Sequence, residues 1–96
     1  MTCYILAEIQ INNRDRYADY EAGFLSVLQA HQGELIAVDE ARKVLEGQAF
    51  GQRTVILRFN SEAQAKTWYE SEEYQALIAI RQAASQANVS MIRALD

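Results

Sequence analysis

The sequence predicts a small α+β domain in which a sheet of four or five strands is backed by helices. Segments of alternating apolar and polar residues, typical of strands, are interleaved with segments in which apolar residues recur every three or four positions, typical of helices. The chain has 96 residues, which suits one domain. Half of them are hydrophobic, which is generous for so short a chain, so part of the apolar surface is expected in an interface. It has no proline and no low-complexity tract that would mark a linker. We therefore expect residues 1–96 to form a single domain.

A strand, a long helix and a pair of short strands are expected in the first half of the chain. Residues 2–11 alternate between an apolar and a half-apolar face, which predicts a strand covered on both faces. Asn13 is a good N-cap for a helix over residues 14–31, and Gly33 is expected to end that helix. The two short strands are expected over 34–38 and 43–46, with a turn between them.

The second half of the chain predicts a strand, a helix in two parts and a last strand. Residues 53–59 contain a continuous apolar run, which is typical of a strand buried on both faces. Ser61 and Gln64 have the spacing of a capping box, so a helix should begin there. Ser71 resembles a second N-cap and predicts a kink or restart of that helix. Residues 87–95 are expected to form the last strand.

The order of these elements is that of a ferredoxin-like βαββαβ protomer, with 43–46 as an extra short strand. Helices would cover one face of the sheet, and no element is left to cover the other. A second copy of the chain is the economical cover, so we expect a homodimer. We also expect the strands at 2–11 and 53–59 to be parallel neighbours. Glu8 and Arg58 would then pair across them, either as a structural ion pair or as the polar lining of a barrel cavity.

Several stretches of the sequence resemble one bacterial family. The most specific is the block from Trp68 to Arg81, where aromatic pairs precede an arginine. The others are Tyr4-Ile5-Leu6-Ala7-Glu8-Ile9, Tyr17 with Tyr20, Val44-Leu45-Glu46-Gly47, and Val55-Ile56 with Phe59. Together they resemble the domain-of-unknown-function family numbered 1330, which belongs to the dimeric α+β barrel superfamily. The resemblance covers nearly the whole chain. It implies a ferredoxin-like protomer and a homodimer with facing sheets, but no reaction. Val38 and Arg58 depart from the family's usual arginine and acidic residue, which indicates rearranged polar contacts on the sheet.

Composition excludes several classes of partner and site. The net charge of −4 and the absence of a basic stripe argue against nucleic acid as a partner. No apolar run approaches the roughly 20 residues that span a bilayer, and no signal peptide is evident, so we expect a cytoplasmic protein without a membrane partner. One histidine and one cysteine cannot build a typical zinc site. The four glycines match neither a dinucleotide fingerprint nor a phosphate loop, so no metal or cofactor is expected.

Arg81 and His31 are the candidate catalytic residues. Arg81 shares an apolar helical stripe with Tyr74, where a guanidinium would hold the carboxylate or enolate of a small substrate. The alternative for Arg81 is a structural ion pair with Glu46 or Glu8, or a side chain that reaches solvent. His31 would act as a general base near neutral pH, or it would only interact with the dipole of the helix that it ends.

Tyr20, Trp68 and Tyr74 are expected to shape a ligand pocket between sheet and helices, with Arg81 and Glu46 as its polar members. At helical spacing the same aromatic residues would equally form a core. Two functions therefore stay open. One is a homodimeric protein that binds or converts a small acidic or aromatic metabolite. The other is a non-catalytic dimeric structural or regulatory module without a ligand site.

Overall fold

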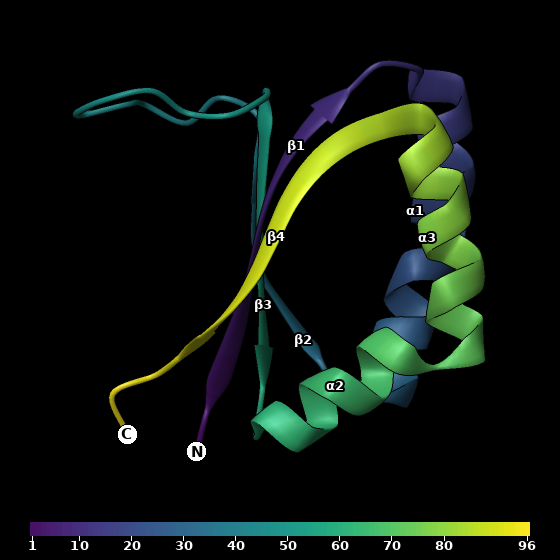
Figure 1. The fold of residues 1–96 in the computed structure, drawn as a ribbon, viewed down its shortest axis with the longest axis vertical. Helices are drawn as coiled ribbons and strands as arrows, with labels where there is room; N and C mark the ends of the chain where they lie inside the picture. The colour runs from purple at the N-terminus through teal and green to yellow at the C-terminus, as the bar shows by residue number, and fades with distance from the viewer.

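A four-stranded antiparallel sheet lies against three helices in the computed structural model, which describes residues 1–96 (Figure 1). The elements are β1 (Cys3–Ile11), α1 (Arg14–Ala30), β2 (Glu34–Asp39), β3 (Arg53–Phe59), α2 (Glu62–Glu70), α3 (Glu72–Ala84) and β4 (Ser85–Arg93). The strands are ordered β2-β3-β1-β4. All three helices lie on the same side of the sheet (Figure 1). The predicted ferredoxin-like βαββαβ fold is confirmed, with α2 and α3 together in the place of its second helix.

The predicted parallel pairing of the first strand with residues 53–59 is wrong. β1 and β3 are antiparallel neighbours, with Glu8 opposite Thr54 and Arg58 opposite Tyr4. The connection through α1 makes β2, not β3, parallel to β1, and β3 then inserts between those two strands. Glu8 and Arg58 are therefore too far apart along the strands to pair. Arg58 instead pairs with Glu34, at 3.4 Å between Nη1 and Oε1.

The predicted short strand over 43–46 is also wrong, because residues 40–52 form an irregular arm that leaves the sheet on the side opposite the helices (Figure 1). Two of its backbone carbonyls accept hydrogen bonds from a side chain rather than from a neighbouring strand. Arg42 donates to the carbonyl oxygens of Phe50 at 2.7 Å and of Gly51 at 2.6 Å. Sequence alternation alone could not reveal a turn that is held by one arginine.

The N-termini of all three helices are capped by the residues that the sequence indicated. The side chains of Asn13, Ser61 and Ser71 each accept a hydrogen bond from the backbone N–H three residues later. The predicted capping box is only half formed. The Gln64 side chain donates to Gln32 at 2.6 Å and does not return to Ser61.

Gly33 ends α1 for a different reason from the one the sequence indicates. The left-handed residue is Gln32, with φ of 63°, and the N–H of Gly33 donates to the carbonyl of Leu28 at 2.9 Å, which completes a Schellman motif. A Cβ on Gly33 would overlap Leu28 and lie 2.7 Å from the Phe59 ring. Glycine is needed at this position for close packing and not for backbone freedom.

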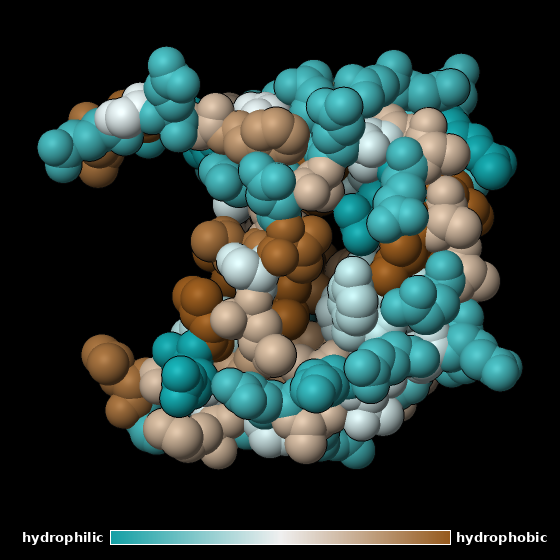
Figure 2. All heavy atoms as spheres, viewed as in Figure 1, coloured by the Kyte–Doolittle hydropathy of each residue, from teal (hydrophilic) through white to brown (hydrophobic).

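The core lies between the sheet and the helices. Alternate residues of β1 face the helices and are buried, and the largest fully buried side chains are Trp68, Tyr17, Phe59, Leu28 and Cys3. The other face of the sheet has no helix over it (Figure 1). We call it the open face. Figure 2 shows apolar side chains gathered in the hollow between the arm and the C-terminal end of the chain. None of the helices is both long enough and apolar enough to cross a bilayer.

Candidate functional site

A cavity of about 210 Å³ lies between the sheet and the helices, and all four strands and all three helices contribute to its wall. Of its 17 lining residues, 14 are hydrophobic. Figure 2 shows the molecule hollowed between the two layers. Val38 lines this cavity. Arg58, the other departure from the family pattern, extends from the open face, because its neighbours Leu57 and Phe59 are buried against the helices.

Arg81 lies in the last turn of α3 and lines the cavity, and the residue is only 6% exposed. No carboxylate oxygen lies within 4.0 Å of it, so the ion pair that the sequence offered with Glu46 or Glu8 is absent. Its guanidinium carbon is 5.9 Å from the centroid of the Tyr20 ring. The partial negative charge at the end of α3 and this ring face offset part of the cost of burying the cation.

The hydroxyl groups of Tyr20 and Tyr74 are 2.7 Å apart and buried, so they form a hydrogen-bonded phenol pair between α1 and α3. Burial raises the pKa of both tyrosines. The neighbouring Tyr74 raises the pKa of Tyr20 further, whereas Tyr20 and the Arg81 guanidinium partly counter the rise at Tyr74. Both hydroxyls therefore stay protonated at neutral pH. One proton is shared within the pair, and the other has no protein acceptor.

Trp68 forms an aromatic wall with Tyr74, because their rings stack at 4.1 Å between centroids. The Trp68 side chain is fully buried, and its indole N–H has no hydrogen-bond partner. Trp68, Tyr20 and Tyr74 belong to the hydrophobic core and also line the cavity. These aromatic residues therefore form part of the core and part of the cavity wall at the same time.

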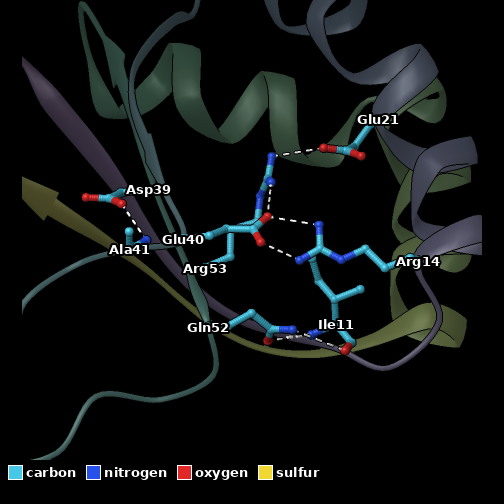
Figure 3. A network of polar contacts seen from close by, with 8 residues as sticks. All are labelled: Ile11, Arg14, Glu21, Asp39, Glu40, Ala41, Gln52 and Arg53. Atoms are coloured by element: carbon cyan, nitrogen blue, oxygen red, sulfur yellow. Dashed lines mark hydrogen bonds and ion pairs between the residues drawn. The ribbon is translucent and has the colours of Figure 1, made fainter.

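Arg53, a second arginine that lines the cavity, is neutralised by carboxylates (Figure 3). Its guanidinium lies 3.0 Å from an oxygen of Glu21 and 2.7 Å from an oxygen of Glu40, and Arg14 binds the same Glu40 carboxylate through two nitrogens. Hydrogen bonds from Arg14 and then Arg53 lower the pKa of Glu40 to about 2. Sequence reasoning missed this network. Its four members come from α1, the arm and β3, and no sequence spacing links them.

His31 and Glu46, the remaining predicted site residues, do not line this cavity. The Nδ1 atom of His31 is 3.0 Å from the carbonyl of Val27, and its Nε2 atom is 4.0 Å from Glu73. Glu46 is exposed on the arm. The structure therefore brings together Arg81, Tyr20, Trp68 and Tyr74 and leaves the other two outside. No group of three or more His, Cys, Asp or Glu side chains is placed to hold a metal ion.

A second hollow of about 210 Å³ lies between α2 and β4. Ile5 and Val89 line both hollows, so the two flank the same central part of the sheet. The second hollow has Lys66, Tyr69 and Glu70 at its wall but no buried charge. We therefore take the first cavity, which contains Arg81, as the candidate site.

The chain matches one protein family along nearly its whole length. The sequence profile of a family described as "Domain of unknown function (DUF1330)" matches residues 2–95. A comparison with curated proteins finds no match.

Three solved structures illustrate the likeness in fold. A protein of unknown function from Rhodopseudomonas palustris has a TM-score of 0.83 at 16% identity, covering 99% of this chain and 83% of that one. A dimeric ferredoxin-like protein of unknown function from Jannaschia sp. has a TM-score of 0.79 at 12% identity, with 98% and 100% covered. A cofactor-independent oxygenase from Streptomyces nogalater has a TM-score of 0.70 at 7% identity, with 99% and 94% covered. At these identities the likeness shows the fold alone.

Proposed function

Since the chain belongs to the family of domain of unknown function 1330, whose description names no reaction, we propose a function from the cavity itself. The protein is a homodimer that binds, or converts, a small organic acid with an apolar or aromatic body. Arg81 holds the acidic group, and Tyr20, Trp68 and Tyr74 contact the body. The observation that carries this proposal is a buried arginine that lines an apolar cavity and has no carboxylate partner.

A buried guanidinium without a counter-ion is costly, by several kcal/mol in an ordinary protein interior. An anionic ligand that enters the cavity would supply the missing counter-ion and offset this cost. The mostly hydrophobic lining suits an apolar ligand body. The cavity, at about 210 Å³, lies below the roughly 300–1,000 Å³ of sites for drug-sized ligands, which favours a small metabolite.

The homodimer follows from the open face, which carries the apolar residues Leu6, Ile56 and Ile92, with Ile92 48% exposed. Leu45 on the arm and Leu95 near the C-terminus are 93% and 106% exposed, and both segments project on the side of the open face (Figure 1). A facing copy would bury all of these side chains. The Jannaschia relative is described as dimeric, which supports this arrangement. Light scattering should report about twice the 10.9 kDa chain mass, and a monomer at micromolar concentration would refute the dimer.

Ligand binding can be tested by fluorescence, because Trp68 is the only tryptophan and forms part of the cavity wall. Titration with benzoate and 1-naphthoate should change the Trp68 emission in a saturable way. Arg81→Met should weaken this binding by roughly 10- to 100-fold, the loss expected for one charge-assisted hydrogen bond of about 1.5–3 kcal/mol. The matched control is Arg93→Met, at an arginine whose side chain is 78% exposed, which should bind as the wild type does. Equal affinity of the wild type and Arg81→Met, or no binding of either acid, would overturn the proposal.

A further inference from the structure

The two arginines that line the cavity differ in the polar groups around them. Its ionisable lining residues are Tyr17, Tyr20, Glu21, Arg53, Tyr74 and Arg81. The only carboxylate among them, Glu21, is bound to Arg53. The Arg81 guanidinium lies over the Tyr20 ring and partly counters the rise that burial causes in the pKa of Tyr17, Tyr20 and Tyr74, so the ionisable groups around it are tyrosine hydroxyls and not carboxylates. This end of the cavity therefore offers hydrogen-bond donors and a positive charge, but no negative charge.

The charges of the two arginines differ in how far they are balanced. Arg53 lies beside Tyr17, at 5.6 Å from its ring centroid, and its charge is balanced by Glu21 and by the Glu40 carboxylate shared with Arg14 (Figure 3). Arg81 lies beside Tyr20 and has no carboxylate. The cavity as a whole thus has one uncompensated positive charge, and its position is defined.

The phenol pair adds a second donor beside that charge. In a hydrogen bond between two hydroxyls, one oxygen donates and the other accepts, and the accepting hydroxyl keeps a proton of its own. Neither Tyr20 nor Tyr74 has another protein partner for that proton. Because burial raises the pKa of both groups, both hydroxyls stay protonated near neutral pH, and the pair offers one free O–H donor to the cavity.

We infer that Arg81 and the Tyr20–Tyr74 hydroxyl pair form a site for a single anionic oxygen, and that this site favours the ionised form of an enol or phenol as well as a carboxylate. This inference deepens the proposed function and rests on it. A neutral hydroxyl satisfies these donors less well, because its oxygen accepts more weakly than an anionic oxygen and leaves the charge of Arg81 unbalanced. An enolate or phenolate presents only lone pairs. The ligand hydroxyl loses its proton to solvent as it binds, and no covalent bond changes apart from that O–H bond.

The ionisation of 4-nitrophenol, visible as the yellow of its anion, tests this preference directly. The wild-type protein should bind the anion at least about tenfold more tightly than the neutral phenol, so that the pKa of the bound probe falls by about one unit or more. The matched uncharged probe is 4-nitroanisole, which has the same ring and no ionisable hydrogen. It should bind through the apolar wall alone, more weakly than the nitrophenolate, and with no dependence on pH in the neutral range.

Variants separate the two donors. Arg81→Met should abolish the lowering of the probe's pKa, and Arg81→Lys should retain part of it because a positive charge remains. Tyr20→Phe and Tyr74→Phe should each reduce it, and Tyr69→Phe is the control, at a partly exposed tyrosine outside this cavity. Circular dichroism of each variant checks that it is folded, and Arg81→Lys carries the test if Arg81→Met does not fold.

The outcomes distinguish this inference from the proposed function. If 4-nitroanisole and 4-nitrophenol bind equally and the pKa of the bound phenol is unchanged, the anionic-oxygen site is overturned while ligand binding in the cavity stands. If neither probe nor the aromatic acids bind, both proposals fail. If the pKa falls in the wild type and equally in Arg81→Met and Arg81→Lys, the charge lies elsewhere and the inference is wrong.

Discussion

The hydroxyls of Tyr20 and Tyr74 should stabilise the protein as a pair. The costs of removing each hydroxyl alone should add up to more than the cost of removing both together. The oxygens are 2.7 Å apart and buried. Tyr20→Phe or Tyr74→Phe alone loses this hydrogen bond and leaves the partner hydroxyl buried without it, which costs about 1–3 kcal/mol. In the double variant no unpaired hydroxyl remains. The two single costs should therefore exceed the cost of the double variant by about 1 kcal/mol.

The assay is urea unfolding of the wild type, both single variants and the double variant, followed by circular dichroism. A free energy of unfolding of about 5–15 kcal/mol is usual for a domain, so a 1 kcal/mol coupling is measurable from the midpoints. Tyr69→Phe is the matched control, because the Tyr69 hydroxyl has no protein partner and the residue is 38% exposed. Costs that add to within about 0.3–0.5 kcal/mol would show that the two hydroxyls act independently, and would refute the pair.

Three further outcomes follow from the packing and the charges. Gly33→Ala should lower the free energy of unfolding by about 1–3 kcal/mol, measured in urea, because its Cβ would meet the Phe59 ring at 2.7 Å; a neutral effect would contradict this packing. Because the pKa of Glu40 is lowered from 4.5 to about 2, its ionised carboxylate stabilises the folded protein above about pH 4.5, and this stability is lost as the pH falls toward 2. Glu40→Gln should therefore make the free energy of unfolding depend less on pH between these values, and an unchanged profile would contradict the network. Arg42→Gln should release the arm and speed its cleavage by chymotrypsin, whose sites at Leu45 and Phe50 the substitution leaves intact, and an unchanged cleavage rate would show that Arg42 does not hold the arm.

The site was only partly accessible to sequence reasoning. Arg81 and Tyr74 could be recognised because they are seven positions apart on one helix, which places them on the same face, and this spacing can be read from the sequence. The partner hydroxyl, on Tyr20, comes from another helix, and its distance of 2.7 Å depends on how α1 packs on α3. Sequence spacing could not show that Arg81 lacks a carboxylate partner. Glu46 is exposed on the arm, away from Arg81, and Glu8 lies on the opposite face of the sheet.

Corrections at the level of the fold have the same origin. The strand over 43–46 and the parallel pairing of Glu8 with Arg58 were wrong because both depend on which backbone groups meet across the sheet. Arg42 satisfies the carbonyls of the arm, and the antiparallel register places Arg58 opposite Tyr4. Neither contact is visible in the pattern of a single segment.

By itself, the sequence determined the α+β fold, the helix starts at Asn13, Ser61 and Ser71, and an apolar stripe that contains an arginine. These features depend on periodicity and on hydrogen bonds between near neighbours in the chain. Only the tertiary structure decided which of two arginines keeps a free charge, because that depends on carboxylates from distant segments. Glu21 and Glu40 reach Arg53, and no carboxylate reaches Arg81. As a result, Arg81 has the one unbalanced charge in the apolar cavity between the sheet and the helices.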